Sequence, residues 1–151
     1  MNTCPVSRPG PAHGFTLIEL TIAMTIIAIL AAIAISTYQM QVRDSRRTEA
    51  RTAVLDLAGR EERNFATSNA YSTVPSQLGY SGAAFPVTVG SGYYQITVAV
   101  VAGVAGTPAT YTITATPLGS QVADTQCTSF SVTSTGVQSA TGTNAANCWA
   151  Q

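Results

Sequence analysis

Lysine is absent from this sequence of 151 residues, and charged residues of all kinds make up only 9% of it. From Asn64 to Gln151 the only charged side chain is Asp124. Such a region stays soluble through hydroxyl, amide and backbone groups, which is unusual for a cytosolic enzyme and acceptable in a secreted building block. The length suits one domain plus an N-terminal segment. The charges indicate neither a basic face for nucleic acid nor an acidic tail.

One long hydrophobic run extends from Phe15 to Ile35, and Glu19 is its only charged residue. As an α-helix this run would be about 31 Å long, which is enough to cross the hydrocarbon core of a bilayer. Residues 1–14 contain Arg8 together with prolines and glycines, so they cannot form a continuous helix. The pattern predicts a non-helical leader followed by a membrane-length helix.

Three interpretations fit this N-terminus. Ala32 and Ala34 have the A-x-A spacing of an ordinary secretory cleavage site, and an uncleaved signal anchor fits equally well. Both leave Glu19 unexplained, because a carboxylate in a hydrophobic segment costs about 2–3 kcal/mol on insertion scales. Cleavage between Gly14 and Phe15 explains it, since the new ammonium at Phe15 is a cationic partner for a buried carboxylate.

The stretch from Gly14 to Glu19, GFTLIE, followed by an apolar helix, resembles the class III signal of type IV pilins and pseudopilins. The resemblance implies that a prepilin peptidase cleaves after Gly14 and N-methylates Phe15, and that Glu19 pairs with the N-terminus of a neighbouring subunit during assembly. Methylation keeps the positive charge of the amine. The resemblance also implies a single-pass inner-membrane protein that enters an extracellular pilus, with other pilin subunits and the inner-membrane assembly platform as partners.

Residues 15–35 are therefore expected to form a transmembrane and assembly helix that continues as an amphipathic helix over residues 36–66. Many major pilins carry a glycine and a proline where this chain has Ala28 and Ser36, so this helix should run unbroken from Phe15 to about Ala66. That departure weakens the case for a bulk fibre subunit. The expected apolar stripe of the second half consists of Ala50, Val54, Leu57, Ala58 and Phe65.

Six of the seven basic residues, all arginines, lie between positions 43 and 63. We interpret them as a solvated helix face with local ion pairs, and inter-subunit pairing or contact with anionic lipid head groups is the alternative. A nucleic acid is not expected as a partner, because acidic residues are interleaved and no aromatic residues alternate with the arginines. The pairs at three- or four-residue spacing are Asp44/Arg47, Arg46/Glu49 and Asp56/Arg60.

Residues 67–151 are expected to form a globular, β-rich domain. Turn-forming residues predict an extended loop over Ala66–Val87, and β-branched and aromatic residues predict strands at Tyr93–Val101, Thr110–Thr116 and Ser129–Thr133. Alternation in the second strand places Tyr111, Ile113 and Ala115 toward the helix. The expected fold class is α+β, a long N-terminal helix packed on a small antiparallel sheet, which is the pilin fold.

The helix sequence, together with the motifs GYY, TATP, DTQC and a closing CW, resembles the PilE-type minor pilins of type IVa systems from Gly14 to Trp149. This resemblance implies a minor pilin of a Gram-negative bacterium that functions in pilus assembly, surface attachment or twitching motility. The alternatives are a pseudopilin of type II secretion and a pilin for adhesion or DNA uptake.

Two cysteines, Cys127 and Cys148, remain once the leader with Cys4 is removed. Their separation of 21 positions in a Thr/Ser-rich domain predicts a disulfide in an oxidising compartment, with two buried free thiols as the alternative. Closing a loop of about 20 residues contributes roughly 3 kcal/mol in the chain-entropy model. Trp149 is expected to pack as a cap over the bridge.

No catalytic residue is expected. Removal of the leader takes away His13, and a chain without histidine or lysine lacks the base of Ser-His and Cys-His schemes and the amine of a Schiff base. Paired-carboxylate chemistry needs two acids in one pocket, but the β-rich domain has only Asp124. We also expect no metal and no cofactor, and interpret Asp124 as a loop-end hydrogen-bond acceptor in preference to a calcium ligand.

Overall fold

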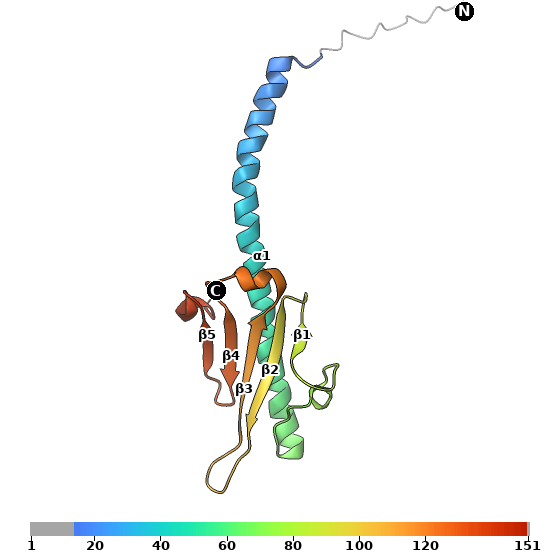
Figure 1. Cartoon of the computed structure of the whole chain (residues 1–151), viewed down its shortest axis with the longest axis vertical. Coiled ribbons are helices and arrows are strands. Elements are labelled where there is room, and N and C mark those ends of the chain that lie inside the picture. The colour runs from blue at the N-terminus through green and yellow to red at the C-terminus, as the bar shows by residue number, and fades with distance from the viewer. Residues whose placement is uncertain (1–13, 151) are drawn as a thin grey trace, which may run out of the picture. The chain divides into compact units, whose positions relative to one another are not determined.

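The computed structural model describes residues 14–150, so the predicted leader, apart from Gly14, lies outside the described residues together with Cys4, Arg8 and His13. Its longest element is helix α1, Leu17–Ser68 (Figure 1). The contacts within the chain separate two units, residues 1–39 and 40–151, and each is considered by itself. The boundary between the units falls inside α1, so α1 contributes to both.

Helix α1 is a single α-helix, as the sequence predicts from the absence of glycine and proline before Gly59. The predicted limits, Phe15 and about Ala66, compare with observed limits of Leu17 and Ser68. The residue that ends the helix is Asn69, whose φ of 54° is left-handed, a conformation that asparagine tolerates better than most residues. Gly59 lies within α1 and does not interrupt it.

A five-stranded antiparallel sheet forms the rest of the second unit, with the strand order β1-β2-β3-β4-β5. The three predicted strands are present as β2 (Tyr94–Val101), β3 (Thr110–Pro117) and β4 (Ser129–Thr133). The edge strands β1 (Val87–Val89) and β5 (Gln138–Thr141) were not predicted, because they are short and carry little alternation. Three 3-10 helices, Pro75–Leu78, Gly119–Ala123 and Ala145–Asn147, lie in the connections.

The prediction of an extended loop over Ala66–Val87 was wrong at both ends and in the middle. Helix α1 continues to Ser68, the loop contains the 3-10 helix Pro75–Leu78, and Val87 already belongs to β1. Buried Pro75 and Leu78 anchor this segment, which short-range turn signals did not reveal. The α+β fold class itself is confirmed.

The core lies between the sheet and the part of α1 that begins at residue 40. Ala50, Val54 and Leu57 are completely buried, as the predicted stripe requires, and they pack in one cluster with residues of β2, β3 and β4. On β3 the predicted inward residues Tyr111, Ile113 and Ala115 are all buried. Each such large apolar side chain contributes about 1.5–3 kcal/mol on burial, so this stripe determines which face of α1 meets the sheet.

Candidate functional site

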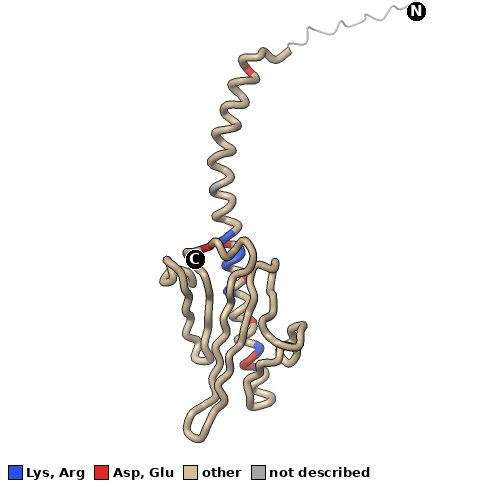
Figure 2. The backbone as a smooth tube through the Cα atoms, in the orientation of Figure 1, with Lys and Arg blue, Asp and Glu red and all other residues tan. Residues whose placement is uncertain are grey.

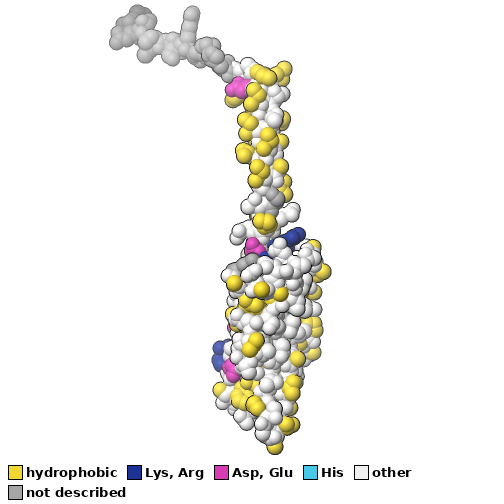
Figure 3. Space-filling model, turned by 90° about the vertical axis from the view of Figure 1, so that its left-hand side faces the viewer, with side chains coloured by type: hydrophobic (Ala, Val, Ile, Leu, Met, Phe, Trp, Pro, Cys, Tyr) yellow, Lys and Arg dark blue, Asp and Glu magenta, His cyan; other side chains and the backbone are white. Residues whose placement is uncertain are grey.

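The first unit is notable for hydrophobic side chains that no part of the described chain covers. Phe15 is 87% exposed, and the large apolar residues from Leu17 to Ile35 are exposed as well. Figure 3 shows these side chains along the N-terminal part of the helix. By length and composition alone, this is the one helix in the described residues that could cross a membrane.

Two of the three threonine hydroxyls of this apolar segment donate hydrogen bonds within the helix. The hydroxyl of Thr21 donates to the carbonyl of Ile18 at 2.9 Å, and the hydroxyl of Thr25 donates to the carbonyl of Thr21 at 2.8 Å. These bonds hide the hydroxyl groups from a hydrophobic environment. Glu19 remains as the only charged side chain between Phe15 and Ile35, and the nearest basic residue along the helix is Arg43.

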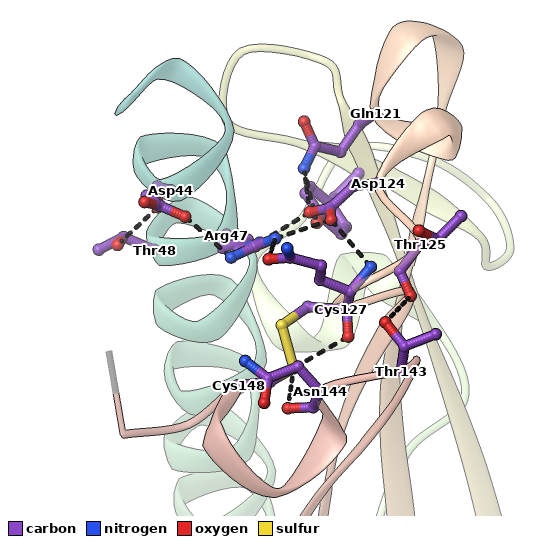
Figure 4. A network of polar contacts seen from close by, with 12 residues as sticks. Asp44, Arg47, Thr48, Gln121, Asp124, Thr125, Cys127, Thr143, Asn144 and Cys148 are labelled. Atoms are coloured by element: carbon purple, nitrogen blue, oxygen red, sulfur yellow. Dashed lines mark hydrogen bonds and ion pairs between the residues drawn. A yellow bond between two sulfur atoms is a disulfide. The ribbon is translucent and has the colours of Figure 1, made fainter. Parts of the chain in front are cut away.

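The second unit contains a polar cluster that the sequence did not predict, centred on Arg47 (Figure 4). The guanidinium Nε and Nη2 of Arg47 donate to the two carboxylate oxygens of Asp124, each at 2.7 Å, and Nη1 donates to Asp44 at 2.8 Å. Asp124 also accepts a hydrogen bond from the side-chain amide of Gln121 at 3.0 Å and one from the backbone N–H of Gln126 at 3.2 Å.

Burial makes this ion pair different from an ordinary surface pair. The side chain of Arg47 is 6% exposed and that of Asp124 is 1% exposed. Burial alone raises the pKa of Asp124, but the hydrogen bonds and charge of Arg47 outweigh it, so the pKa lies below its ordinary value of 3.8. The hydrogen bond from Arg47 to Asp124 likewise raises the pKa of the guanidinium, against the effect of its own burial. Both groups are therefore charged at neutral pH.

These contacts correct the prediction of a solvated arginine face. The predicted pair Asp44/Arg47 is present, but Arg47 points into the protein and its principal partner is Asp124, 77 positions away. The expected loop-end hydrogen bond of Asp124 is present at Gln126, and the ion pair was missed. A lone carboxylate in an otherwise uncharged domain was the available signal, because such a group needs a cation and all arginines of residues 14–150 lie in α1.

The two other predicted pairs have different outcomes. Asp56 and Arg60 form their pair at 2.7 Å, and the hydroxyl of Tyr80 also donates to Asp56. The predicted pair of Arg46 with Glu49 was wrong. Instead the guanidinium of Arg46 lies 3.4 Å from the centroid of the Tyr93 ring, a cation–π contact.

Glu49 takes a different partner, the turn between β1 and β2. Its carboxylate accepts hydrogen bonds from the backbone N–H and the hydroxyl of Ser91, at 2.9 and 2.8 Å. In Figure 2 the blue and red stretches of this unit lie on α1, apart from one red segment, and Asp124 is the only charged residue of the sequence after α1. Charged side chains of α1 thus bind the loops that connect the strands, Glu49 at Ser91 and Arg47 at Asp124.

A second buried acid, Glu61, was also missed by the sequence analysis. Its side chain is completely buried, one oxygen accepts the backbone N–H of Ser72 at 3.0 Å, and the other has no hydrogen-bond partner among the described residues. Burial raises the pKa of Glu61 above its ordinary value of 4.5. Glu61 lies four residues after Leu57, which belongs to the apolar stripe of α1. Helix periodicity alone therefore places Glu61 on the buried face.

The predicted disulfide is present between Cys127 and Cys148, and both residues are buried. Trp149 is half-buried, and its ring meets the ring of Phe130 edge-on at a centroid distance of 5.9 Å. The indole N–H of Trp149 donates to the carbonyl of Ser139 at 2.8 Å. Trp149 therefore fastens the C-terminus to β4 and β5.

Comparison with known proteins agrees with this combination of an apolar helix and a disulfide-closed sheet domain. Residues 36–131 match the family described as type IV minor pilin ComP, DNA uptake sequence receptor, which is more than half of the chain. The chain belongs to this type IV minor pilin family. Residues 11–35 match the prokaryotic N-terminal methylation motif, so the resemblance of the signal to that of type IV pilins is confirmed.

One curated relative is the type IV major pilin protein PilA of Myxococcus xanthus (strain DK1622), which is 39% identical over 77 residues. The match covers 50% of this chain and 35% of that protein, so the matched part of the chain spans about a third of the length of this relative. The family match supports a minor pilin, as the resemblance implied, and the matched family is ComP, whereas the sequence motifs had indicated the PilE type.

Proposed function

We propose that this protein is a structural minor subunit of a type IV pilus, held in the fibre by residues 15–35 of α1. The observation that carries the proposal is the exposed hydrophobic segment with Glu19 as its single charge. About 20 apolar residues that no described part of their own chain covers need either a bilayer or the helices of other subunits. The family match to minor pilins supports a passage from the bilayer to a bundle of helices from other subunits.

In this proposal a prepilin peptidase cleaves between Gly14 and Phe15 and methylates the new N-terminus. The processed protein stays in the inner membrane of a Gram-negative cell until the assembly platform and other pilin subunits take it into the extracellular fibre. The match to the N-terminal methylation motif supports this processing. The role is structural and involves no catalysis, because the processed chain would contain neither histidine nor lysine.

Glu19 is proposed to pair with the Phe15 ammonium of a neighbouring subunit. Each charge alone would be costly in a bundle of apolar helices, and together they compensate. Only one axial stagger between neighbouring helices brings the two groups together, so the pair would also fix the register of assembly.

The proposal is tested with Glu19→Gln and Glu19→Asp in a strain that forms pili, with Glu62→Gln as the matched control outside the apolar segment. We expect all three proteins to be processed, which intact mass of the membrane fraction would show as a mature start at methylated Phe15. Sheared fibres should contain Glu62→Gln at the parental level, Glu19→Asp at a reduced level and little Glu19→Gln. Parental amounts of Glu19→Gln in sheared fibres would contradict the ion pair. A mature start at Ile35 or Ser36 would contradict pilin processing altogether.

A second candidate function, DNA binding, is favoured by the description of the matched family as a DNA uptake sequence receptor. The charge distribution argues against it, since residues 64–151 carry one charged side chain and that one is a buried acid. Phosphate contacts by arginine make binding fall steeply with salt. Fluorescence anisotropy of a labelled duplex at about 50 and 200 mM salt would show whether the protein binds DNA through phosphate contacts. Binding that falls with salt and is lost in Arg43→Gln would establish the second function.

A further inference from the structure

The two cysteines lie in segments that other contacts already hold together. The backbone N–H of Thr143 donates to the carbonyl of Thr125, and that of Asn144 donates to the carbonyl of Gln126, each at 3.0 Å. These bonds join the loop before Cys127 to the loop that leads to Cys148. They involve no sulfur atom, so they are available whether the cysteines are oxidised or reduced.

Gly142 allows this pairing. Its φ is +130°, and a Cβ atom at this position would meet the backbone carbonyl of Gln126. A residue other than glycine would therefore be strained by its backbone and would collide with the neighbouring chain. The close approach of the two segments therefore depends on Gly142 and does not require the disulfide.

Helix α1 holds both cysteine-bearing segments from the other side. Arg47 fixes Asp124, three residues before Cys127, through two hydrogen bonds of 2.7 Å. One turn further along α1, Arg51 donates from Nη1 to the carbonyl of Cys148 at 3.3 Å. Arg47 and Arg51, one turn apart on α1, therefore contact Asp124 near Cys127 and the carbonyl of Cys148. Figure 4 shows the contact of Arg47 with Asp124 beside the two cysteines.

We propose that Arg47 is a positioning residue for oxidation of the Cys127–Cys148 pair. Its ion pair with Asp124 docks residues 124–127 on α1 in the dithiol form, so that the disulfide closes on a C-terminal region that is already folded. The consequence is a high effective concentration of one thiol at the other, which is a property of the native reduced protein and falls when the docking is removed.

The reaction is an ordinary thiol–disulfide exchange with an external disulfide, which accepts the two electrons. One cysteine thiolate attacks a sulfur of that disulfide, forming a mixed disulfide and releasing one thiolate. The second cysteine thiolate then attacks the sulfur of the first cysteine, forming the Cys127–Cys148 bond and releasing the second thiolate. The two cysteine protons go to solvent, and Arg47 takes no part in bond making.

The test measures the equilibrium between dithiol and disulfide in glutathione redox buffers, using the full chain with Cys4→Ser in mild detergent. Acid quenching, alkylation and intact mass give the two forms, and the ratio gives the effective concentration of the cysteine pair. We expect Arg47→Met to lower this value about tenfold or more, the change that corresponds to each 1.4 kcal/mol of docking free energy lost. Arg47→Lys keeps the charge but loses the two-pronged geometry, and should fall by a smaller factor.

Leu78→Ala is the matched control, because it removes a buried side chain from the 3-10 helix Pro75–Leu78 and so lowers global stability without removing any hydrogen bond of Asp124. While both redox forms remain folded, it should leave the effective concentration at the parental value. Equal falls in Leu78→Ala and Arg47→Met would overturn the proposal, since the effect would then be one of stability alone. Parental values for Arg47→Met and Arg47→Lys would overturn it as well, as would a Cys127→Ser/Cys148→Ser chain without a folded sheet domain.

Discussion

Replacing Arg47 by methionine should be one of the most destabilising single changes in the sheet unit. Methionine retains most of the stem of the side chain but removes both hydrogen bonds to Asp124 and the positive charge. Asp124, with a side chain that is 1% exposed, would keep hydrogen bonds from neutral donors, namely the side-chain amide of Gln121 and the backbone N–H groups of Gln126 and Cys127. Those neutral donors do not compensate a buried negative charge.

Removing one partner of a buried ion pair costs about 3–5 kcal/mol, because the other charge stays in the interior. Since a domain has about 5–15 kcal/mol in total, this loss would remove a large part of it. Asp124→Asn should cost less than Arg47→Met. The asparagine keeps an acceptor for the backbone N–H of Gln126, and Arg47 keeps its 2.8 Å contact with Asp44. The double variant has no unpaired charge, so it should be more stable than Arg47→Met alone.

Urea unfolding followed by fluorescence can measure this cycle, because Trp149 is the only tryptophan and its ring contacts Phe130 in the core. Full-length protein in mild detergent gives the midpoint and slope for the parent, the two single variants and the double variant. We expect a coupling energy of about 2–3 kcal/mol between the two positions. Additive effects, or a loss below about 1 kcal/mol for Arg47→Met, would show that the pair behaves like a surface salt bridge.

The stability that the Arg47–Asp124 pair contributes should fall in acid. The pKa of Asp124 lies below its ordinary value of 3.8 in the folded protein, so the pair contributes its full stability above that value. The contribution is lost as the pH falls through the folded pKa. In Arg47→Met the carboxyl has no cation, so its loss of stability relative to the parent should be large at pH 7 and should shrink in acid.

Periodicity made the helix and the central strands predictable, and long-range pairing made the buried polar contacts unpredictable. Val54 and Ile113 follow from spacing, since burial of one face imposes a period of 3.6 on a helix and of 2 on a strand. Arg47 also lies beside the buried face of α1, but its local partner Asp44 offered a sufficient explanation on the surface. Only the fold brings Asp124 to it from 77 positions away.

The short edge strands were missed for a related reason. A strand of three or four residues contains too little alternation to be distinguished from a turn, and β1 and β5 exist because β2 and β4 provide hydrogen-bonding edges. The N-terminal segment is the opposite case. Its composition and the position of Glu19 carry the signal by themselves, and no tertiary contact is needed to recognise it.

Two further perturbations test single features of the sheet unit. Gly142→Ala should destabilise by about 2 kcal/mol or more, because a Cβ at a φ of +130° meets the carbonyl of Gln126, and the urea midpoint would show it. Ser139→Ala, on exposed β5, is its control and should be nearly neutral. Glu61→Gln should stabilise the protein at neutral pH, because the glutamine keeps an acceptor for Ser72 and carries no charge into a fully buried site. Burial raises the folded pKa of Glu61 above 4.5, so the parent binds this proton more tightly when folded and loses stability as the pH rises from 4.5 through the raised value. The advantage of Glu61→Gln should therefore grow between pH 4.5 and neutral pH, and a difference of constant size across that interval would mean that folding does not raise the pKa of Glu61.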